Sequence, residues 1–348
     1  MAFIVPMSPT RTYNPNLDGQ KKDFWKNKRV LVTGGNGFLG SHVVDKLKER
    51  GSIVFAPRKI DFDIRTKTDA YNILSLEPDI VLHLAATCGG IGANAARPAD
   101  YGFDNLVMGL NVIDACAYQG VQKLVLIGTT CSYPADTPLP LKEEDIWDGY
   151  PEATNAPYGI AKRALLTMAQ AYRAQYGLNS IYLIPANLYG PRDNFDLETS
   201  HVIPAIIRKC VQAVTEGQET VSLWGDGTPT REFLYVEDCA EAILLAAERY
   251  DGAEPVNVGT GFHNSIAYIA QEIALLTGFT GRFVWDTDRP NGQACRVLDT
   301  TRARQEFGFR AKTPLETGLR CTIEWYITQI VHPDSVGLPL AERVRAAV

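Results

Sequence analysis

The stretch VTGGNGFLGSHV, residues 32–43, decides the fold class. It places Gly34, Gly37 and Gly40 between a run typical of a β-strand and a segment with helical spacing. A Gly-x-x-Gly-x-x-Gly loop in that context allows a tight turn and a close approach of the backbone to a pyrophosphate, and it presents free amides at the start of a helix. We therefore interpret it as a dinucleotide-binding loop rather than as a merely structural glycine-rich turn.

Outward from this loop, short apolar runs alternate with helix-like segments. The strand candidates are 28–35, 52–57, 79–86, 121–130 and 179–187, and the helix candidates are 41–51, 104–120 and 156–177. Such an alternation predicts βαβ units, and hence an α/β fold with a Rossmann-type, doubly wound parallel sheet. After about residue 190 the segments become shorter and richer in turns, which indicates a smaller C-terminal α/β substrate lobe. We divide the chain into an N-terminal arm (1–28), a Rossmann domain to which later strand segments return (29–190), the substrate lobe (191–330) and a C-terminal tail (331–348).

The composition narrows the function classes. The chain has 348 residues and a formal net charge of −6, so we expect neither nucleic acid nor a membrane surface as its main partner. The seven cysteines contain no C-x-x-C pair, which predicts reduced thiols in a cytoplasmic enzyme without a metal site. We expect six of them to be small buried hydrophobes. Cys131, in the segment GTTCSYP (128–134), stands apart because hydroxyls and a tyrosine crowd around it directly after a strand.

The end of the second strand predicts which dinucleotide binds. An acid there accepts from the ribose 2′-hydroxyl of NAD, whereas an arginine accommodates the 2′-phosphate of NADP. The strand is followed by Arg58 and Lys59, with no acid before Asp61. We therefore predict NADP(H), with Arg58 on the phosphate; the alternative is that Arg58 is a solvated surface charge. Asp63, slightly further on, is a candidate for the adenine edge.

A candidate catalytic pair follows in the segment YGIAK. Tyr158 and Lys162 are four residues apart on a predicted helix, and therefore share one face. An ammonium beside a phenol lowers the phenol pKa. Thr129, at the end of the preceding strand, offers a hydroxyl that could hydrogen-bond a carbonyl or an alkoxide.

At this point the chain resembles a known family over about residues 29–328. The stretches that carry the resemblance are GGIGANAARPADY, CSYP, EATNAPYGIAK, NLYGPRDNF, SHVIPAIIRK, WGDGTPTREFLYVED, NVGTG and, more loosely, DRPNGQACRVLD. The family is that of the extended short-chain dehydrogenase/reductases that act on nucleotide sugars, and within it the GDP-L-fucose synthases.

The resemblance implies a two-stage reaction on GDP-4-keto-6-deoxymannose. In that family a cysteine and a histidine, matched here by Cys131 and His201, epimerise the sugar at carbons 3 and 5. NADPH then reduces carbon 4, with the tyrosine matched by Tyr158 as proton donor, and the product is GDP-L-fucose. A colitose-type or heptose-type epimerase/reductase and an epimerase without reduction remain alternatives. A non-catalytic NADP-sensing protein is disfavoured, because the catalytic side chains are all present.

The resemblance also assigns positions by motif. The catalytic set is Thr129, Cys131, Tyr158, Lys162 and His201. The cofactor contacts are Gly34, Asn36, Gly37, Phe38, Leu39, Gly40, Arg58, Asp63, Leu84, Ala85, Ala86, Lys162, Pro185, Asn187, Leu188 and His201. For the GDP-sugar we predict contacts from Asn94, Asn187, Val202, Lys209, Trp224, Arg231 and Arg289; the alternative for Trp224 is an aromatic residue in the core of the smaller lobe.

Other implications concern assembly and the exact sugar. The helices near 105–119 and 156–176 resemble the family's dimer face, so we expect a homodimer. Thr129 stands where serine is more usual and Lys209 where arginine is usual, which leaves the reaction type intact but the exact sugar open. The N-terminal arm has no counterpart in the resemblance.

Overall fold

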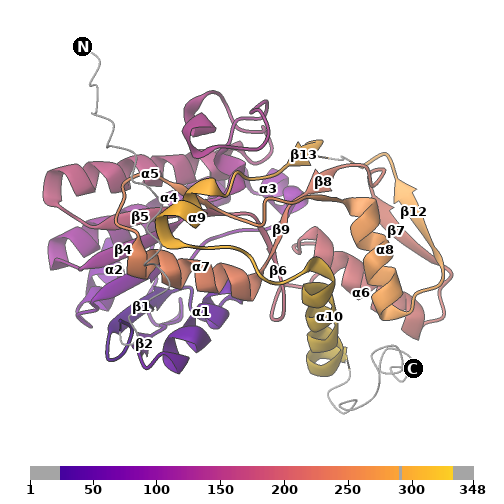
Figure 1. Ribbon diagram of the computed structural model, residues 1–348, viewed down its shortest axis with the longest axis horizontal. Coiled ribbons are helices and arrows are strands. Elements are labelled where there is room, and N and C mark those ends of the chain that lie inside the picture. The colour runs from indigo at the N-terminus through magenta and orange to yellow at the C-terminus, as the bar shows by residue number, and fades with distance from the viewer. Residues whose placement is uncertain (1–23, 290–291, 332–348) are drawn as a thin grey trace.

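The computed structural model describes residues 24–289 and 292–331, and these form two lobes side by side (Figure 1). The larger lobe is built on a six-stranded sheet in the order β10-β5-β4-β3-β1-β2, and every pairing in it is parallel. Its strands are β1 (Arg29–Thr33), β2 (Ile53–Phe55), β3 (Ile80–His83), β4 (Lys123–Ile127), β5 (Ser180–Pro185) and β10 (Val256–Val258). This arrangement confirms the predicted α/β, doubly wound fold.

Helices cover both faces of this sheet. The helices α1 (Phe38–Glu49), α7 (Val236–Arg249) and α9 (Thr301–Phe307) pack on one face, and α2 (Lys67–Leu74), α4 (Pro98–Gln119) and α5 (Ala156–Tyr176) pack on the other. Right-handed crossovers require this division, because the chain leaves β1 toward β2 and then returns past β1 to β3. The reversal between β1 and β3 creates the crevice at the carboxyl edge where α/β sheets bind their ligands.

The predicted helix at 156–177 is confirmed as α5, which ends where Gly177 adopts a left-handed φ of 71°. The predicted helix at 104–120 begins earlier, at Pro98, because proline has a φ suited to the first helical turn and needs no hydrogen-bonded amide there. The short helix α3 (Ile91–Ala96) occupies much of the segment GGIGANAARP, residues 89–98, that leads into α4.

The smaller lobe has a core of its own, in which Ile206, Ile269 and Ile323 are buried. It contains the parallel pair β7–β12, the three-stranded sheet β11-β8-β13, and the nearby pair β6–β9. The bounds are β6 (Asn187–Tyr189), β7 (Thr220–Trp224), β8 (Thr230–Arg231), β9 (Phe233–Tyr235), β11 (Asn264–Ser265), β12 (Arg282–Asp286) and β13 (Cys295–Arg296), with helices α6 (Val202–Thr215), α8 (Ile266–Thr277) and α10 (Leu315–Tyr326). The division of the chain near residue 190 stays a prediction.

The ends of the chain differ in how far the structure describes them. Most of the predicted arm (1–28) and the tail beyond residue 331 lie outside the described residues. The last residues of the arm join the larger lobe, because Trp25 is buried in its core and its carbonyl accepts a hydrogen bond from Ser52 Oγ at 2.8 Å. Within the described part of the chain, no helix is both long and apolar enough to cross a bilayer.

Candidate active site

The glycine loop between β1 and α1 has the geometry of a phosphate cradle. Gly34 has a φ of +72°, and a Cβ there would collide with the backbone of Ala85. A Cβ on Gly40 would overlap the carbonyl oxygen of Gly34, so only glycine lets the helix pack this closely on the turn. Helix α1 starts at Phe38 without a side chain capping its first amides. The amides of the first helical turn and the positive end of the helix dipole fit a pyrophosphate.

The predicted cofactor residues further along the chain gather at the carboxyl edge of the same sheet. Leu84 and Ala85 directly follow β3, and their amides donate to the backbone oxygen and the hydroxyl of Thr33 at 3.1 and 3.4 Å. Pro185 ends β5, while Asn187 and Leu188 lie in β6. Strands that pair in parallel bring these ends together, as a dinucleotide site requires.

Arg58 lies where a 2′-phosphate would be expected, just after β2. Its side chain is 68% exposed and forms an ion pair with the exposed Asp61 at 3.2 Å. An exposed pair of this kind contributes little energy, so Arg58 can exchange Asp61 for a phosphate. Asn36 Nδ2 donates to Ala56 O at 2.8 Å and so ties the glycine loop to the same strand end.

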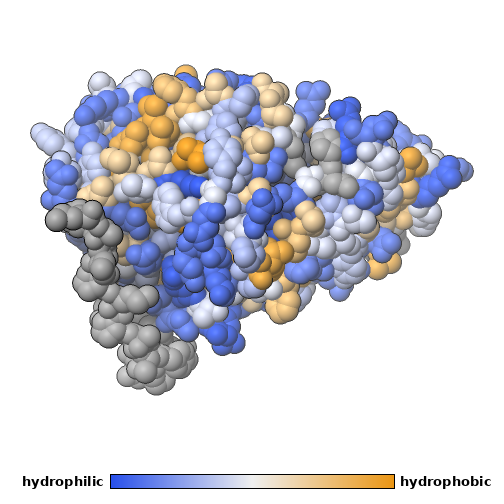
Figure 2. Space-filling model, turned by 90° about the horizontal axis from the view of Figure 1, so that it is seen from above, coloured by the Kyte–Doolittle hydropathy of each residue, from blue (hydrophilic) through white to orange (hydrophobic). Residues whose placement is uncertain are grey.

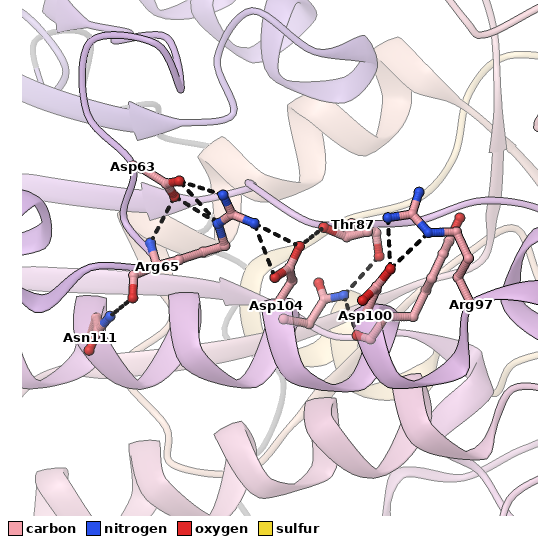
Figure 3. Close-up of polar contacts among 9 residues, drawn as sticks. Asp63, Arg65, Thr87, Arg97, Asp100, Asp104 and Asn111 are labelled. Atoms are coloured by element: carbon pink, nitrogen blue, oxygen red, sulfur yellow. Dashed lines mark hydrogen bonds and ion pairs between the residues drawn. The ribbon is translucent and has the colours of Figure 1, made fainter.

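Asp63 does not stand alone at the predicted adenine edge. Figure 3 shows the Arg65 guanidinium between the carboxylates of Asp63 and Asp104. The hydrogen bond from Arg65 is the largest cause that lowers the pKa of Asp63. Asp63 is therefore a fixed, ionised acceptor near the start of α2.

The predicted catalytic pair, Tyr158 and Lys162, lies on the first turns of α5. Lys162 is 2% exposed, and its Nζ donates to Ile127 O at 2.9 Å and lies 5.9 Å from the centre of the Tyr158 ring. We expected the ammonium to lower the pKa of the phenol. Instead, burial raises the pKa of Tyr158 well above its usual value, and a hydrogen bond with Thr129 acts in the opposite direction. Burial also lowers the pKa of Lys162 to about 8.

Hydrogen bonds of the neighbouring residues fix the turn that carries Cys131. It forms the short 3-10 helix η2 (Thr130–Ser132), in which Thr129 Oγ1 accepts from the amide of Cys131 at 3.1 Å. The fully buried Tyr133 donates its hydroxyl to Asn257 Oδ1 at 2.7 Å. The half-exposed thiol is thus presented on a rigid support at the carboxyl end of β4.

Two guanidinium groups lie beside this turn. Arg231 of β8 and Arg296 of β13 are opposite each other in a parallel pair, and Arg296 also donates to Thr130 O. Burial lowers the pKa of both groups, the charge of Arg296 lowers that of Arg231 further, and Cys131 acts in the opposite direction on both. Neither forms an ion pair with a carboxylate among the described residues. Two adjacent, unneutralised cations constitute a site for an anion.

His201 is the N-cap residue of α6, in the smaller lobe. The residue as a whole is exposed, but the protein around it removes water from the imidazole, and this desolvation lowers the imidazole pKa. The preceding loop contacts the larger lobe, because the amide of Gly90 donates to Thr199 O at 3.4 Å. This contact places His201 near the segment that follows β3. Because its pKa is lowered, the imidazole is neutral near neutral pH.

The predicted substrate contacts separate into two groups. Trp224 is 51% exposed at the end of β7, with the guanidinium of Arg289 5.1 Å from its ring centre, and Lys209 Nζ donates to Ser222 O on the same strand at 2.8 Å. Val202 is half-buried at the start of α6. Asn94, by contrast, is buried, and its amide nitrogen donates to the carbonyls of Gly89 and Gly90. Its contact with a sugar hydroxyl stays a prediction.

Comparison with known proteins assigns this site to a family. The model of the NAD dependent epimerase/dehydratase family matches residues 30–259. The chain belongs to this family. It is similar to the GDP-L-fucose synthase of Sinorhizobium fredii, with 40% identity over 87% of this chain and 96% of that protein. Among solved structures it is similar to a GDP-6-OMe-4-keto-L-xylo-heptose reductase from C. jejuni, with a TM-score of 0.83 and 28% identity over 87% of this chain and 98% of the other. The GDP-L-fucose synthetase of Naegleria fowleri bound to NADP has a TM-score of 0.80 and 29% identity over 87% and 94% of the two chains.

Sequence reasoning did not single out Cys88, which the structure places near Tyr158 and Lys162. Cys88 follows the carboxyl end of β3 as Cys131 follows that of β4, and it is exposed. Its electrostatic interaction raises the pKa of both Tyr158 and Lys162. The expectation of six buried cysteines was wrong: Cys116, Cys210 and Cys239 are buried, but Cys88 is exposed and Cys295 and Cys321 are half-exposed. The position of Cys88 after a parallel strand was the signal that could have revealed it.

Proposed function

We propose that the protein is an NADPH-dependent epimerase/reductase that converts GDP-4-keto-6-deoxymannose to GDP-L-fucose. The observation that carries this proposal is the convergence of the Cys131 turn with Thr129, Tyr158 and Lys162 at the carboxyl edge of the sheet. The GDP-L-fucose synthase name of the relative that is 40% identical, and the NADP in the fucose synthetase structure, support the same substrate and cofactor.

The side chains suit proton transfer next to a ketone. Removal of a proton alpha to a carbonyl needs a base that is neutral or anionic near pH 7, and return of a proton to the other face needs an acid there. The neutral imidazole of His201 and the thiol of Cys131 have those capacities. Thr129 and Tyr158 supply the hydroxyl donors that stabilise the enolate oxygen.

Reduction uses the same two hydroxyls. Bound NADPH supplies the hydride to carbon 4. Because its pKa is raised, Tyr158 keeps its proton in the absence of substrate and can donate it to the developing alkoxide. Lys162 is positioned by Ile127 O beside the phenol, where its positive charge stabilises the tyrosinate that forms.

The smaller lobe provides contacts for the nucleotide. The adjacent guanidinium groups of Arg231 and Arg296 match the charge of a diphosphate, next to the sugar-facing thiol. The exposed ring of Trp224 offers a stacking surface for guanine, and the Lys209 ammonium, from helix α6, lies against the same strand through its hydrogen bond to Ser222 O. Arg289, which now lies against Trp224, is a further contact for the GDP moiety.

We also infer a cytoplasmic homodimer. Large apolar side chains are exposed on the neighbouring helices α4 and α5, among them Phe103, Tyr118 and Tyr176, each at least 60% exposed. Seen from above, apolar residues gather over the larger lobe, at the upper left of Figure 2. A patch of this kind favours a helical interface between two copies. Sedimentation measurements test it, and a monomer at micromolar concentration would contradict it.

The activity is tested by incubating the protein with NADPH and GDP-4-keto-6-deoxymannose. We expect NADPH consumption and a product whose proton spectrum shows inversion at carbons 3 and 5. Cys131→Ser should abolish solvent deuterium incorporation at those carbons, whereas the matched control Cys321→Ser, on α10, should not. Deuterium entry at the wild-type rate in Cys131→Ser would reject the role of this thiol, and no NADPH consumption by the wild type would reject the proposed substrate.

A heptose substrate is the second candidate, favoured by the TM-score of 0.83 to the heptose reductase. The extra carbon of a heptose lies beyond carbon 5 of the ring. Competition between GDP-4-keto-6-deoxymannose and a GDP-4-keto-heptose in one reaction separates the two, because the preferred substrate is the one with the larger kcat/KM.

A further inference from the structure

Arg65 lies at the centre of a polar cluster that the activity does not explain. Its Nε donates to Asp63 Oδ1 at 2.9 Å and its Nη2 to Asp63 Oδ2 at 2.6 Å. Its remaining nitrogen, Nη1, reaches both oxygens of Asp104 at 3.4 and 3.5 Å. One guanidinium therefore bridges two carboxylates, as Figure 3 shows.

The bridge is anchored on α4. Asp104 lies on this helix and also accepts from the hydroxyl of Thr87 at 3.3 Å. One to two turns further along, Asn111 Nδ2 donates to the backbone oxygens of Ile64 and Arg65, each at 3.0 Å. Both the side chain and the backbone of Arg65 are thus tied to a long, packed helix, which leaves the residue little freedom to move.

The geometry suits an acceptor that must be held still. A bidentate pair between arginine and a carboxylate fixes the plane of the carboxylate as well as its charge. Asp63 is 29% exposed in its side chain, so solvent, or a ligand in its place, still reaches it. A carboxylate has about four acceptor positions, and three donors of Arg65 use this one: the backbone amide at 3.2 Å to Oδ1, Nε and Nη2. One position is left for a further donor.

We propose that Arg65 is a positioning residue for the cofactor: held on α4 by Asp104, it orients the Asp63 carboxylate to accept a hydrogen bond from the adenine amino group. This inference rests on the proposed use of NADPH. Arg65 does not touch the reacting atoms, and its effect is confined to the adenine half of the cofactor.

The chain offers a matched control on the same helix. Arg97 pairs with Asp100 through Nε at 2.8 Å and Nη2 at 2.7 Å, and Asp100 precedes Asp104 by one turn of α4. This pair is exposed and lies on the opposite side of Asp104 from Asp63 in Figure 3. Arg97→Ala likewise removes one arginine that is paired with an aspartate of α4, and it should leave the orientation of Asp63 undisturbed.

The experiment measures binding of three probes to the full-length protein without sugar substrate: NADPH, adenosine 2′,5′-bisphosphate as the adenine half, and reduced nicotinamide mononucleotide as the other half. We expect Arg65→Ala to weaken NADPH and the adenine half by roughly tenfold, as for the loss of a charge-assisted hydrogen bond. Arg65→Lys, which keeps the charge but not the fork, should weaken them by about threefold. The nicotinamide half should bind within about twofold of wild type in both variants, and Arg97→Ala should leave all three probes unchanged.

Several outcomes would overturn the proposal. Unchanged binding of the adenine half in Arg65→Ala, while Asp63→Asn weakens it, would show that Asp63 needs no orientation by Arg65. Unchanged binding in both variants would show that adenine does not contact Asp63. Equal weakening of both half-cofactors would indicate a general structural effect, which the melting temperature of Arg65→Lys would independently show. Because no sugar is present, failure of the proposed turnover would leave this result intact.

Discussion

Asp193, in the loop between β6 and α6, is a buried carboxyl group that should make the stability of the protein depend on pH. Its side chain is 8% exposed; one oxygen accepts from the amide of Asn194 at 2.7 Å, and Oδ2 has no hydrogen-bond partner among the described residues. Burial raises the pKa of Asp193 to about 7, from 3.8 in the reference state. The folded protein therefore keeps a proton on this group that the unfolded chain releases.

The sign and the size of the effect follow from that difference. The folded state binds more protons between the two pKa values, so the contribution of Asp193 to stability is most favourable below about pH 4 and is lost as the pH rises to about 7. Two pH units separate pH 5 from the folded pKa, and each unit corresponds to 1.36 kcal/mol, which gives a loss of about 3 kcal/mol between pH 5 and pH 8.

The perturbation is Asp193→Asn, which keeps the shape and removes the titration. Urea unfolding at pH 5 and pH 8 should show that the wild type loses about 3 kcal/mol more than Asp193→Asn over this interval. Glu198→Gln, an exposed carboxyl in the same loop, is the control and should follow the wild type. The buried histidines are present in all three proteins, so their contribution to the pH dependence cancels when the changes in unfolding free energy are compared. An identical pH dependence in wild type and Asp193→Asn would refute the reasoning.

Three further predictions concern the cofactor and substrate contacts. Because burial lowers the pKa of Lys162 to about 8, its ammonium is lost above that value, and kcat/KM for reduction should fall as the pH rises through about 8; a profile flat from pH 7 to pH 10 would contradict this. Gly40→Ala should abolish NADPH binding in a fluorescence titration and lower the melting temperature, whereas Gly37→Ala, whose Cβ would be 3.2 Å from Gly34 O, should do less damage; equal effects would argue against close helix packing as the cause. Trp224→Ala should raise the KM for the GDP-sugar by about tenfold with kcat unchanged, and Trp224→Phe should retain most of the affinity; an unchanged KM in the alanine variant would exclude base stacking.

Much of the larger lobe could be predicted because local patterns agree with the tertiary arrangement there. Residues 156–177 have helical periodicity and a glycine stop, and they form a helix with those bounds. The helix predicted at 104–120 started too late, because α4 begins at Pro98 and proline is well suited to the first turn of a helix. The short pairs of the smaller lobe, such as β8 with β13, join residues about 65 positions apart, and no local pattern specifies such a pairing.

The sequence by itself determined the fold class, the dinucleotide loop, and the types of side chain available for proton transfer, because glycine spacing and strand–helix alternation are local properties of the chain. Only the tertiary structure decided the electrostatic environment of those side chains. It showed that burial, more than Lys162, controls the pKa of Tyr158. It also showed that Arg296 lies next to Arg231 beside Cys131, and that Arg65 forms a salt bridge with Asp63. A pKa or a paired charge depends on which distant segments exclude water and which charges they bring near, and this is settled only when the chain is packed.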